Sequence, residues 1–274
     1  TAYEIMPSLV GSEMCIRDSN ILKSLGAKVY SVGTSPNGLN INLNCGSTFP
    51  DKIRSFSIKK KVDLGISLDG DADRIILCDE KGNIIDGDHI IAMLASRWKR
   101  KKILKGGVIG TLMSNYGLET FLKNEKIKFF RSNVGDRYVK EKMKKLNFNL
   151  GGEQSGHIIM SDYSSTGDGI IAALKVLSIA LTERKPISEI TRAFKPVPQL
   201  LKNIQIRGAQ TIDEGKLRTI SETAEKRIGK KGRVLIRKSG TEPVLRVMVE
   251  SEDEVLIQKI VDDISSELFG NDEQ

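Results

Sequence analysis

Short apolar runs alternate with helix-length amphipathic stretches from about residue 20 onward. Apolar runs bounded by Gly, Pro and Asn predict strands at 27–33, 62–68, 74–80, 106–112 and 127–133. Helical periodicity predicts helices at 49–61, 89–101, 116–125, 137–147 and 169–185. The turn "KGN" folds the strand at 74–80 back as a hairpin, and a second hairpin is expected within 148–163. Strands separated by helices of this length indicate βαβ units with parallel pairing.

Side chains that can cap helices precede two of these stretches. Asp86 or Asp88 is expected to cap the helix at 89–101, and Thr166 or Asp168 the helix at 169–185. Two prolines in 195–201 predict a linker. A strand at 202–208, a helix at 212–228, two strands within 233–251 and a helix at 254–270 follow it. The predicted fold class is therefore α/β, with consecutive βαβ-type mixed-sheet domains followed by a small α+β C-terminal domain.

Composition narrows the function classes. No apolar run approaches the roughly 18 residues of a membrane span, and no signal peptide begins the chain, so we expect a cytoplasmic protein without a membrane partner. The three cysteines show no metal spacing and suggest reduced thiols. The net charge of +8 suits anionic ligands, phosphorylated small molecules included. Its densest run, 97–102, ends a predicted helix without a base-reading motif, so no nucleic-acid partner is expected.

Three aspartates occupy alternate positions directly after a buried apolar strand, in "SLDGDADR". Alternate residues of an extended segment share a face, so Asp69, Asp71 and Asp73 should point to one side. Carboxylates this close raise one another's pKa, which favours a bound cation over a solvated acidic turn. Oxygen ligands suit Mg²⁺ or Ca²⁺. Arg74 beside them is the catalytic candidate, because a guanidinium can hold an anionic group near the metal.

An EF-hand calcium loop is the alternative for this turn. Asp69, Asp71, Asp73 and Glu80 fall at its positions 1, 3, 5 and 12. Position 6 is Arg74, where that loop needs glycine, and the flanks are β runs instead of helices. The turn therefore predicts a hard-cation site of another kind, at the carboxyl end of a strand.

A second chemical segment, "GGEQSGH", combines three glycines with an acid, a hydroxyl and an imidazole. Glu153 and Ser155 alternate, so both can face one ligand, and His157 follows them. Such a set suits sugar hydroxyls, which donate and accept hydrogen bonds. A plain hairpin with a buried histidine explains the spacing equally well.

A third segment, "RKSGTEPVLR", is typical of an anion-binding turn. Ser239, Gly240 and Thr241 offer hydroxyls and backbone N–H groups, while Arg237 and Arg246 can add charge-assisted bonds to a phosphate. A glycine-containing hairpin turn is the alternative. In a fourth segment, "NVGDRYV", a ligand contact and a helix cap with a solvated arginine are equally supported.

Taken together, "DGDADR", "GGEQSGH" and "RKSGTEP" resemble, in this order, the metal, sugar and phosphate loops of the α-D-phosphohexomutase superfamily. Within this superfamily, the sequence most resembles the bacterial phosphoglucosamine mutase branch. The stretches "PNGLNIN", "GTLMSNYGLE", "VGDRYV" and "TGDGI" support the resemblance, which extends from about Asn20 to the C-terminus.

The resemblance implies a function and assigns metal binding and substrate binding to different loops. Members of that branch interconvert glucosamine 6-phosphate and glucosamine 1-phosphate through a phosphoserine and a sugar bisphosphate intermediate. It implies Mg²⁺ held by Asp69, Asp71 and Asp73, and a phosphosugar substrate bound by the residues of the other two loops, namely Glu153, Ser155, His157, Arg237, Ser239, Gly240, Thr241 and Arg246. Phosphoryl transfer depends mainly on positioning and charge stabilisation, which a metal and arginines supply.

The resemblance also predicts the domain boundaries. Residues 1–85 match the remainder of the family's domain 2, 86–195 its domain 3 and 196–274 its domain 4. No Ser-His-Asn-Pro, the family's phosphoserine motif in domain 1, occurs in the chain, so we expect it to be inactive alone. Residues 8–19 have no family counterpart and are interpreted as an insertion or artefact that would interrupt a helix, with a genuine surface loop as the alternative.

Other functions stay open at this point. A phosphomannomutase or phosphoglucomutase would share all three loops, and only Gln154 and Lys238 favour the glucosamine enzyme, by resemblance. A non-catalytic module that binds magnesium or a phosphosugar is the alternative outside the enzyme class. Sequence leaves the oligomeric state, a homodimer included, undecided.

Overall fold

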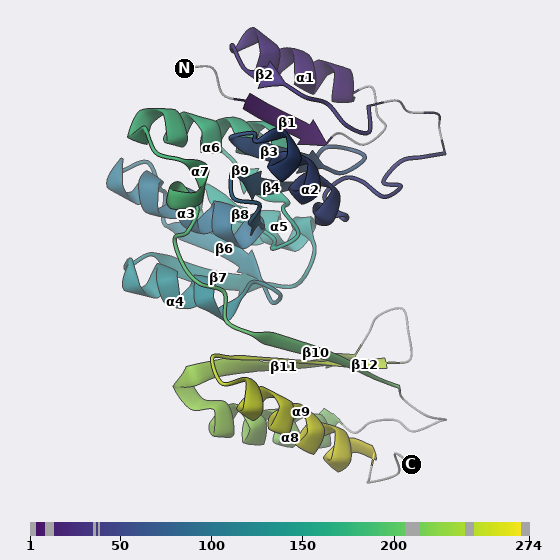
Figure 1. The fold of residues 1–274 in the computed structure, drawn as a ribbon. Helices are drawn as coiled ribbons and strands as arrows, with labels where there is room; N and C mark the ends of the chain where they lie inside the picture. Colours follow the sequence, from purple (N-terminus) through teal and green to yellow (C-terminus); the bar gives the residue numbers. More distant parts are fainter. Residues whose placement is uncertain are drawn as a thin grey trace. The chain divides into compact units, whose positions relative to one another are not determined.

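The computed structural model describes residues 4–8, 14–34, 37, 39–205, 214–238 and 244–269. The chain divides into two compact units (Figure 1). The first unit comprises residues 1–114 and 118–195, and the second comprises residues 115–117 and 196–274.

The first unit begins with a five-stranded mixed sheet in the order β2-β1-β3-β4-β5. Strands β2, β1 and β3 are parallel to one another, whereas β4 pairs antiparallel with both β3 and β5. The elements in this part are β1 (Glu4–Ser8), α1 (Met14–Ser24), β2 (Lys28–Val29), α2 (Pro50–Lys60), β3 (Leu64–Leu68), β4 (Ile75–Asp79) and β5 (Ile84–Ile85).

A four-stranded sheet in the order β7-β6-β8-β9 follows in the same unit. Strands β7, β6 and β8 are parallel, and β9 returns antiparallel to β8. The elements in this part are α3 (Gly87–Arg100), β6 (Gly107–Thr111), α4 (Tyr116–Asn124), β7 (Lys128–Ser132), α5 (Asp136–Leu146), β8 (Leu150–Gly152), β9 (Ile158–Met160), α6 (Gly169–Glu183) and α7 (Ile187–Ile190).

One apolar core joins the two sheets of the first unit. It takes Ile66 and Leu77 from the first sheet, Val108 and Leu150 from the second, and the buried faces of α3 and α6. On their opposite faces the sheets are covered by α2 and α5, respectively, each with a small cluster of its own. Strand β3 is therefore buried along its whole length, as expected for a strand covered on both faces.

The second unit is a three-stranded antiparallel sheet in the order β10-β12-β11. Helices α8 and α9 lie on one face of it and complete a separate apolar core (Figure 1). Its elements are β10 (Gln199–Gln205), α8 (Glu214–Ile228), the 3₁₀ turn η1 (Gly229–Lys231), β11 (Gly232–Lys238), β12 (Val244–Ser251) and α9 (Glu254–Phe269).

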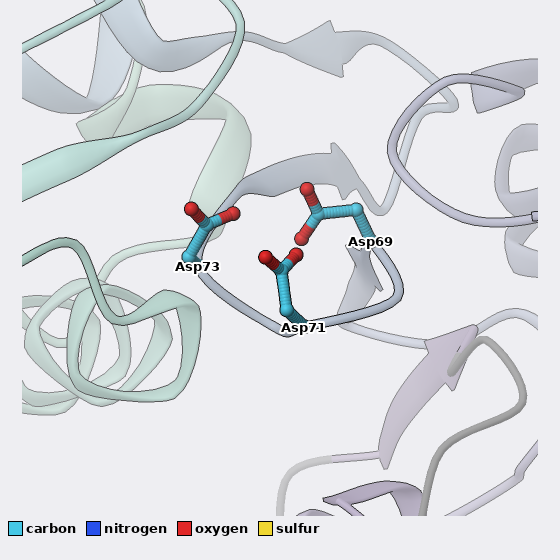
Figure 2. A group of neighbouring side chains, drawn as sticks. All are labelled: Asp69, Asp71 and Asp73. Carbon is cyan, nitrogen blue, oxygen red and sulfur yellow. The ribbon is translucent and has the colours of Figure 1, made fainter. Parts of the chain in front are cut away.

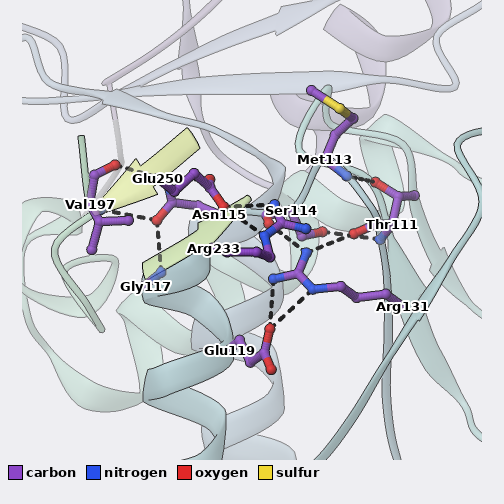
Figure 3. A network of polar contacts seen from close by, with 10 residues as sticks. All are labelled: Thr111, Met113, Ser114, Asn115, Gly117, Glu119, Arg131, Val197, Arg233 and Glu250. Carbon is purple, nitrogen blue, oxygen red and sulfur yellow. Dashed lines mark hydrogen bonds and ion pairs between the residues drawn. The ribbon is translucent and has the colours of Figure 1, made fainter. Parts of the chain in front are cut away.

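Residues 115–117 belong to the second unit, and the side chain of Asn115 bonds to other residues of that unit (Figure 3). Its side-chain oxygen accepts from the N–H groups of Val197 (3.0 Å) and Gly117 (2.8 Å). Its side-chain nitrogen donates to Val197 O (3.1 Å) and to Glu250 Oε1 (3.3 Å). The amide thus pairs with the backbone of Val197 much as a neighbouring strand would.

The α/β fold class with mixed sheets and a small α+β unit is confirmed, and the helices lie close to their predicted ranges. For each of the two helices with two candidate caps, the structure shows which residue is the N-cap: Asp86 for α3 and Asp168 for α6. Asp86 accepts from the backbone N–H of His89 (3.1 Å), and Asp168 from that of Ile171 (2.9 Å).

Three local predictions are wrong. The strand expected at 27–33 shrinks to Lys28–Val29, which lies at the edge of the described sheet and pairs with β1. The expected linker at 195–201 ends early, because Gln199–Leu201 already pair with β12 while the prolines precede them. Residues 14–19, expected to interrupt a helix, belong to α1. Whether residues 8–19 are an insertion stays a prediction, and 9–13 lie outside the described residues.

The predicted boundary between residues 85 and 86 separates the two sheets of the first unit, which share a core, and it stays a prediction. The helices that the structure describes are all too short or too polar to serve as a membrane span.

Candidate active site

The hairpin between β3 and β4 carries the three predicted metal ligands (Figure 2). Leu68 and Ile75 face each other at its base, so residues 69–74 form the connecting loop. One carboxylate oxygen from each of Asp69, Asp71 and Asp73 lies within 4.8 Å of the others, and Figure 2 shows all three side chains turned toward a common space. Strand pairing below the loop therefore gathers the carboxylates at one point.

The three carboxylates differ in exposure and in hydrogen bonding. Asp69 is buried, Asp73 half-buried and Asp71 exposed. Burial is the main cause that raises the pKa of Asp69 to about 6; the charges of Asp73 and Asp71 add to it, and the N–H of Arg74 opposes it. The Arg74 Nε atom lies 3.6 Å from Asp69 Oδ2 and 3.9 Å from Asp73 Oδ1.

The residues fit a hard divalent cation. Asp73 Oδ1 is buried and has no hydrogen-bond partner among the described residues, which is costly for a carboxylate oxygen. The half-exposed guanidinium of Arg74 is too far from it for a hydrogen bond. A cation coordinated by oxygens from all three aspartates would satisfy this atom and relieve the repulsion that raises the pKa of Asp69.

The second predicted segment forms the turn between β8 and β9. Glu153 is half-buried, and its Oε1 accepts from the backbone N–H of Gly135 (2.9 Å). Ser155 is exposed at the tip. His157 differs from both, because its side chain is 3% exposed and both ring nitrogens contact the protein: Nδ1 lies 3.1 Å from Asp73 Oδ2, and Nε2 accepts from Gly167 N–H at 3.2 Å.

The aspartate loop, residues 69–74, and the turn at residues 153–157 lie against each other in the first unit. Ile75 N–H donates to Gly156 O (3.1 Å), and Arg74 and His157 form an isolated antiparallel bridge. Gly156 has φ +99°, and a methyl group there would overlap Ile75 O. Only glycine allows the backbone at position 156 to lie this close to Ile75. The backbone bonds across this contact join the two segments into one cluster.

The third predicted segment lies in the second unit. Arg237 on β11 and Arg246 on β12 face each other directly in the antiparallel register, and both are partly exposed. Like charges opposite each other destabilise a sheet unless an anion or acid offsets them. Ser239, Gly240 and Thr241 lie outside the described residues.

Two backbone contributors were not predicted as site residues. Gly135, in "NVGDRYV", holds Glu153 through its N–H, and its φ of +122° favours glycine. Gly167, in "TGDGI", donates to His157. Both belong to stretches that support the family resemblance, but nothing in the sequence indicates which side chain each N–H meets.

Fold and site together define an α/β protein with mixed sheets and a candidate divalent-cation site on a strand-connecting loop. The family model "Phosphoglucomutase/phosphomannomutase, alpha/beta/alpha domain III" matches residues 86–197, and the C-terminal domain model of the same family matches residues 179–267. The chain belongs to this phosphoglucomutase/phosphomannomutase family.

Within the family, the similarity is to phosphoglucosamine mutases. The chain is 60% identical over 239 residues to that of Pelagibacter ubique, covering 87% of this chain and 54% of the relative. It is 48% identical over 248 residues to that of Bradyrhizobium diazoefficiens, covering 90% of this chain and 56% of the relative. The chain thus spans about half the length of the curated relatives that it matches.

Solved structures share the fold. A phosphoglucomutase/phosphomannomutase family protein from Burkholderia thailandensis superposes with a TM-score of 0.81 at 19% identity, covering 98% of this chain and 60% of that one. The Aspergillus fumigatus N-acetylphosphoglucosamine mutase, solved with GlcNAc-6P and magnesium, gives 0.75 at 20% identity, covering 97% of this chain and 65% of that one.

Proposed function

We propose that this chain supplies the metal, sugar and phosphate loops of a phosphoglucosamine mutase, which interconverts glucosamine 6-phosphate and glucosamine 1-phosphate. The observation that carries the proposal is the cluster of Asp69, Asp71 and Asp73, in which a buried carboxylate oxygen of Asp73 has no hydrogen-bond partner within the described part of the chain. The similarity to phosphoglucosamine mutases supports the choice of reaction.

The metal loop would hold Mg²⁺ through the three aspartates. The bound ion supplies positive charge that stabilises the oxygens of a transferring phosphoryl group. Arg74 is placed to add to that charge: its guanidinium is half-exposed and within 4 Å of two of the carboxylates, so it can reach an anionic group while remaining anchored. We assign it a role in phosphoryl transfer.

The sugar loop would bind the hydroxyl or amino groups of the substrate. Glu153 Oε1 is already held by Gly135, so the carboxylate is oriented before the ligand arrives. Ser155, exposed at the turn, offers a hydroxyl that donates and accepts. Together they can recognise a polar sugar edge.

The second unit would bind the phosphate group of the substrate. Arg237 and Arg246 lie directly opposite each other, which concentrates positive charge beside the predicted anion-binding turn of Ser239, Gly240 and Thr241. We propose that residues 1–85, 86–195 and 196–274 correspond to the remainder of domain 2, to domain 3 and to domain 4 of the family.

Catalysis by this route needs a phosphoryl donor. The family resemblance implies a phosphoserine in a Ser-His-Asn-Pro motif, and that motif does not occur within the 274 residues. The chain alone should therefore bind the substrate without turning it over, and a sugar bisphosphate should serve as the intermediate in a protein that also carries the serine.

Two measurements test the proposal. With Mg²⁺, glucosamine 1-phosphate and a bisphosphate primer, the 274-residue chain should show no ³¹P NMR conversion, and robust turnover would refute the need for an outside donor. Joined to a family segment that carries the serine motif, it should convert glucosamine 1-phosphate, and Asp71→Asn should abolish conversion. Faster conversion of mannose or glucose 1-phosphate would identify the alternative mutases instead.

A further inference from the structure

The environment of His157 determines which ring nitrogen carries the proton. The backbone N–H of Gly167 can only donate, so Nε2 must accept this bond. The contact with Gly167 therefore selects the tautomer of His157 that carries its proton on Nδ1.

Among the described residues, the carboxylate of Asp73 is the acceptor for the proton on Nδ1. Asp73 Oδ2 lies 3.1 Å from Nδ1, and an ionised carboxylate can only accept. The bond occupies Oδ2 and leaves Oδ1 as the buried oxygen without a hydrogen-bond partner in the described part of the chain. The imidazole thus leaves Oδ1 as the oxygen of Asp73 that gives up no hydrogen bond to a described residue when a cation binds.

We propose that His157 is a positioning residue for the metal loop: held as the Nδ1–H tautomer by Gly167, it donates to Asp73 and presents Oδ1 to the cation. This rests on the proposed function for the identity of the cation, but the tautomer does not depend on it. Side chains that orient metal ligands commonly change metal affinity 10- to 100-fold when removed.

Direct contact of His157 with the sugar, the role implied by the resemblance, is disfavoured by the same geometry. The side chain is 3% exposed, and both nitrogens are already engaged within the protein. A ring without a free nitrogen has no hydrogen bond to offer a hydroxyl.

Gly167 completes the arrangement because it approaches the ring closely. A methyl group on Gly167 would lie 2.6 Å from His157 Nε2, closer than side chains tolerate. Its own position is set by a bridge to Ile159, and two residues later Gly169 N–H donates to Ala72 O of the metal loop at 2.9 Å. The stretch "TGDGI" therefore supports the metal loop from two sides, once through His157 and once directly.

Nitrogen NMR of the metal-free chain at pH 8 tests the tautomer. The chain has only two histidines, His89 and His157, so a His89→Asn variant assigns the signals. Long-range ¹H–¹⁵N spectra should show His157 with a protonated Nδ1 and an unprotonated Nε2. An Nε2–H tautomer, or rapid averaging between the two, would overturn the proposal.

Variants test the consequence for the metal loop, with Mn²⁺ binding followed by EPR. His157→Leu and Gly167→Ala should weaken Mn²⁺ binding at least tenfold, whereas His89→Asn should leave it unchanged. His157→Asn, whose amide nitrogen sits near the Nδ1 position, should bind more tightly than His157→Gln. Wild-type affinity in folded His157→Leu, or equal losses in the Asn and Gln variants, would overturn the proposal. If the wild type binds no divalent cation, the proposed function fails. The NMR measurement of the His157 tautomer then decides separately whether Gly167 and Asp73 hold the ring as inferred.

Discussion

Asp69 is the residue at which folding and cation binding make opposite demands. Its side chain is 7% exposed, and burial raises its pKa to about 6, so the ionised form destabilises the metal-free fold near neutral pH. The same ionised carboxylate is what a divalent cation needs. Residues arranged in this way are typical of functional sites rather than of structural ones.

The raised pKa predicts how metal-free stability depends on pH. Between about pH 4 and pH 6 the folded state holds a proton that the unfolded state has lost, so the contribution of Asp69 to stability falls as pH rises. Metal-free Asp69→Asn should therefore match wild type near pH 4 and exceed it at pH 7.5 by up to about 3 kcal/mol. Urea unfolding followed by Trp98 fluorescence measures this difference.

Mg²⁺ should reverse the order. At pH 7.5 the ion should raise the melting temperature of wild type but not of Asp69→Asn, and the shift should shrink at pH 5, where protons compete for the carboxylate. A wild-type shift that is equal at both pH values would contradict the assignment of Asp69 as a ligand.

At the scale of elements, backbone contacts hold the metal and sugar turns together. The strand that leaves the metal loop, β4, pairs through Ile75 with Gly156 of the neighbouring turn. The contact joins the backbone of Ile75 to the backbone of a glycine, so it depends on backbone conformation and not on side-chain chemistry. A glycine substitution is therefore the sharpest probe of it.

Gly156→Ala should destabilise the first unit by about 2–4 kcal/mol, from an unfavourable φ and from overlap with Ile75 O. Gly26→Ala is the matched control, since Gly26 also has a positive φ (+86°) but nothing within 4 Å of an added methyl group. It should cost about 1 kcal/mol. Equal losses in urea unfolding would show that the close approach is unimportant.

Local patterns were enough to predict most elements and the gathering of the three aspartates in one loop. The aspartates of "DGDADR" are neighbours in sequence, so a single hairpin brings them together, and Asp86 and Asp168 mark their helices with caps. The contacts to Glu153 and His157 were not predicted, because their partners Gly135 and Asp73 lie 18 and 84 residues away. The donor to Glu153 is a backbone N–H group, and every residue except proline has one, so the sequence does not mark which residue donates.

At the scale of the whole molecule, each unit has its own apolar core, and the second adds a buried ion pair. Glu250 is fully buried, and its Oε2 accepts from Arg233 at 2.9 and 2.6 Å, while Asn115 approaches its other oxygen. Sequence patterning did not predict this network, since Asn115 and Glu250 are 135 residues apart.

Removal of one partner should destabilise the second unit strongly. Arg233→Met leaves the Glu250 charge buried, and we expect a loss of about 3–5 kcal/mol. Arg218→Met removes an exposed partner of Glu222 and should cost less than about 0.5 kcal/mol. The single tryptophan lies in the first unit, so its fluorescence does not report unfolding of the second unit. Hydrogen exchange of the β12 amides measures the stability of the second unit instead. Equal protection in both variants would contradict the expected role of the pair.

The most direct test of the account is a Mn²⁺ titration of the chain followed by EPR at pH 7.5. We predict one site in wild type, binding weakened at least tenfold in Asp71→Asn, and wild-type binding in Glu252→Gln, which removes the same charge from an exposed position elsewhere. Asp71 is exposed, so its loss should leave the fold intact. Absence of a site in wild type, or undiminished binding by Asp71→Asn, would contradict the assignment of the aspartate cluster as the metal centre.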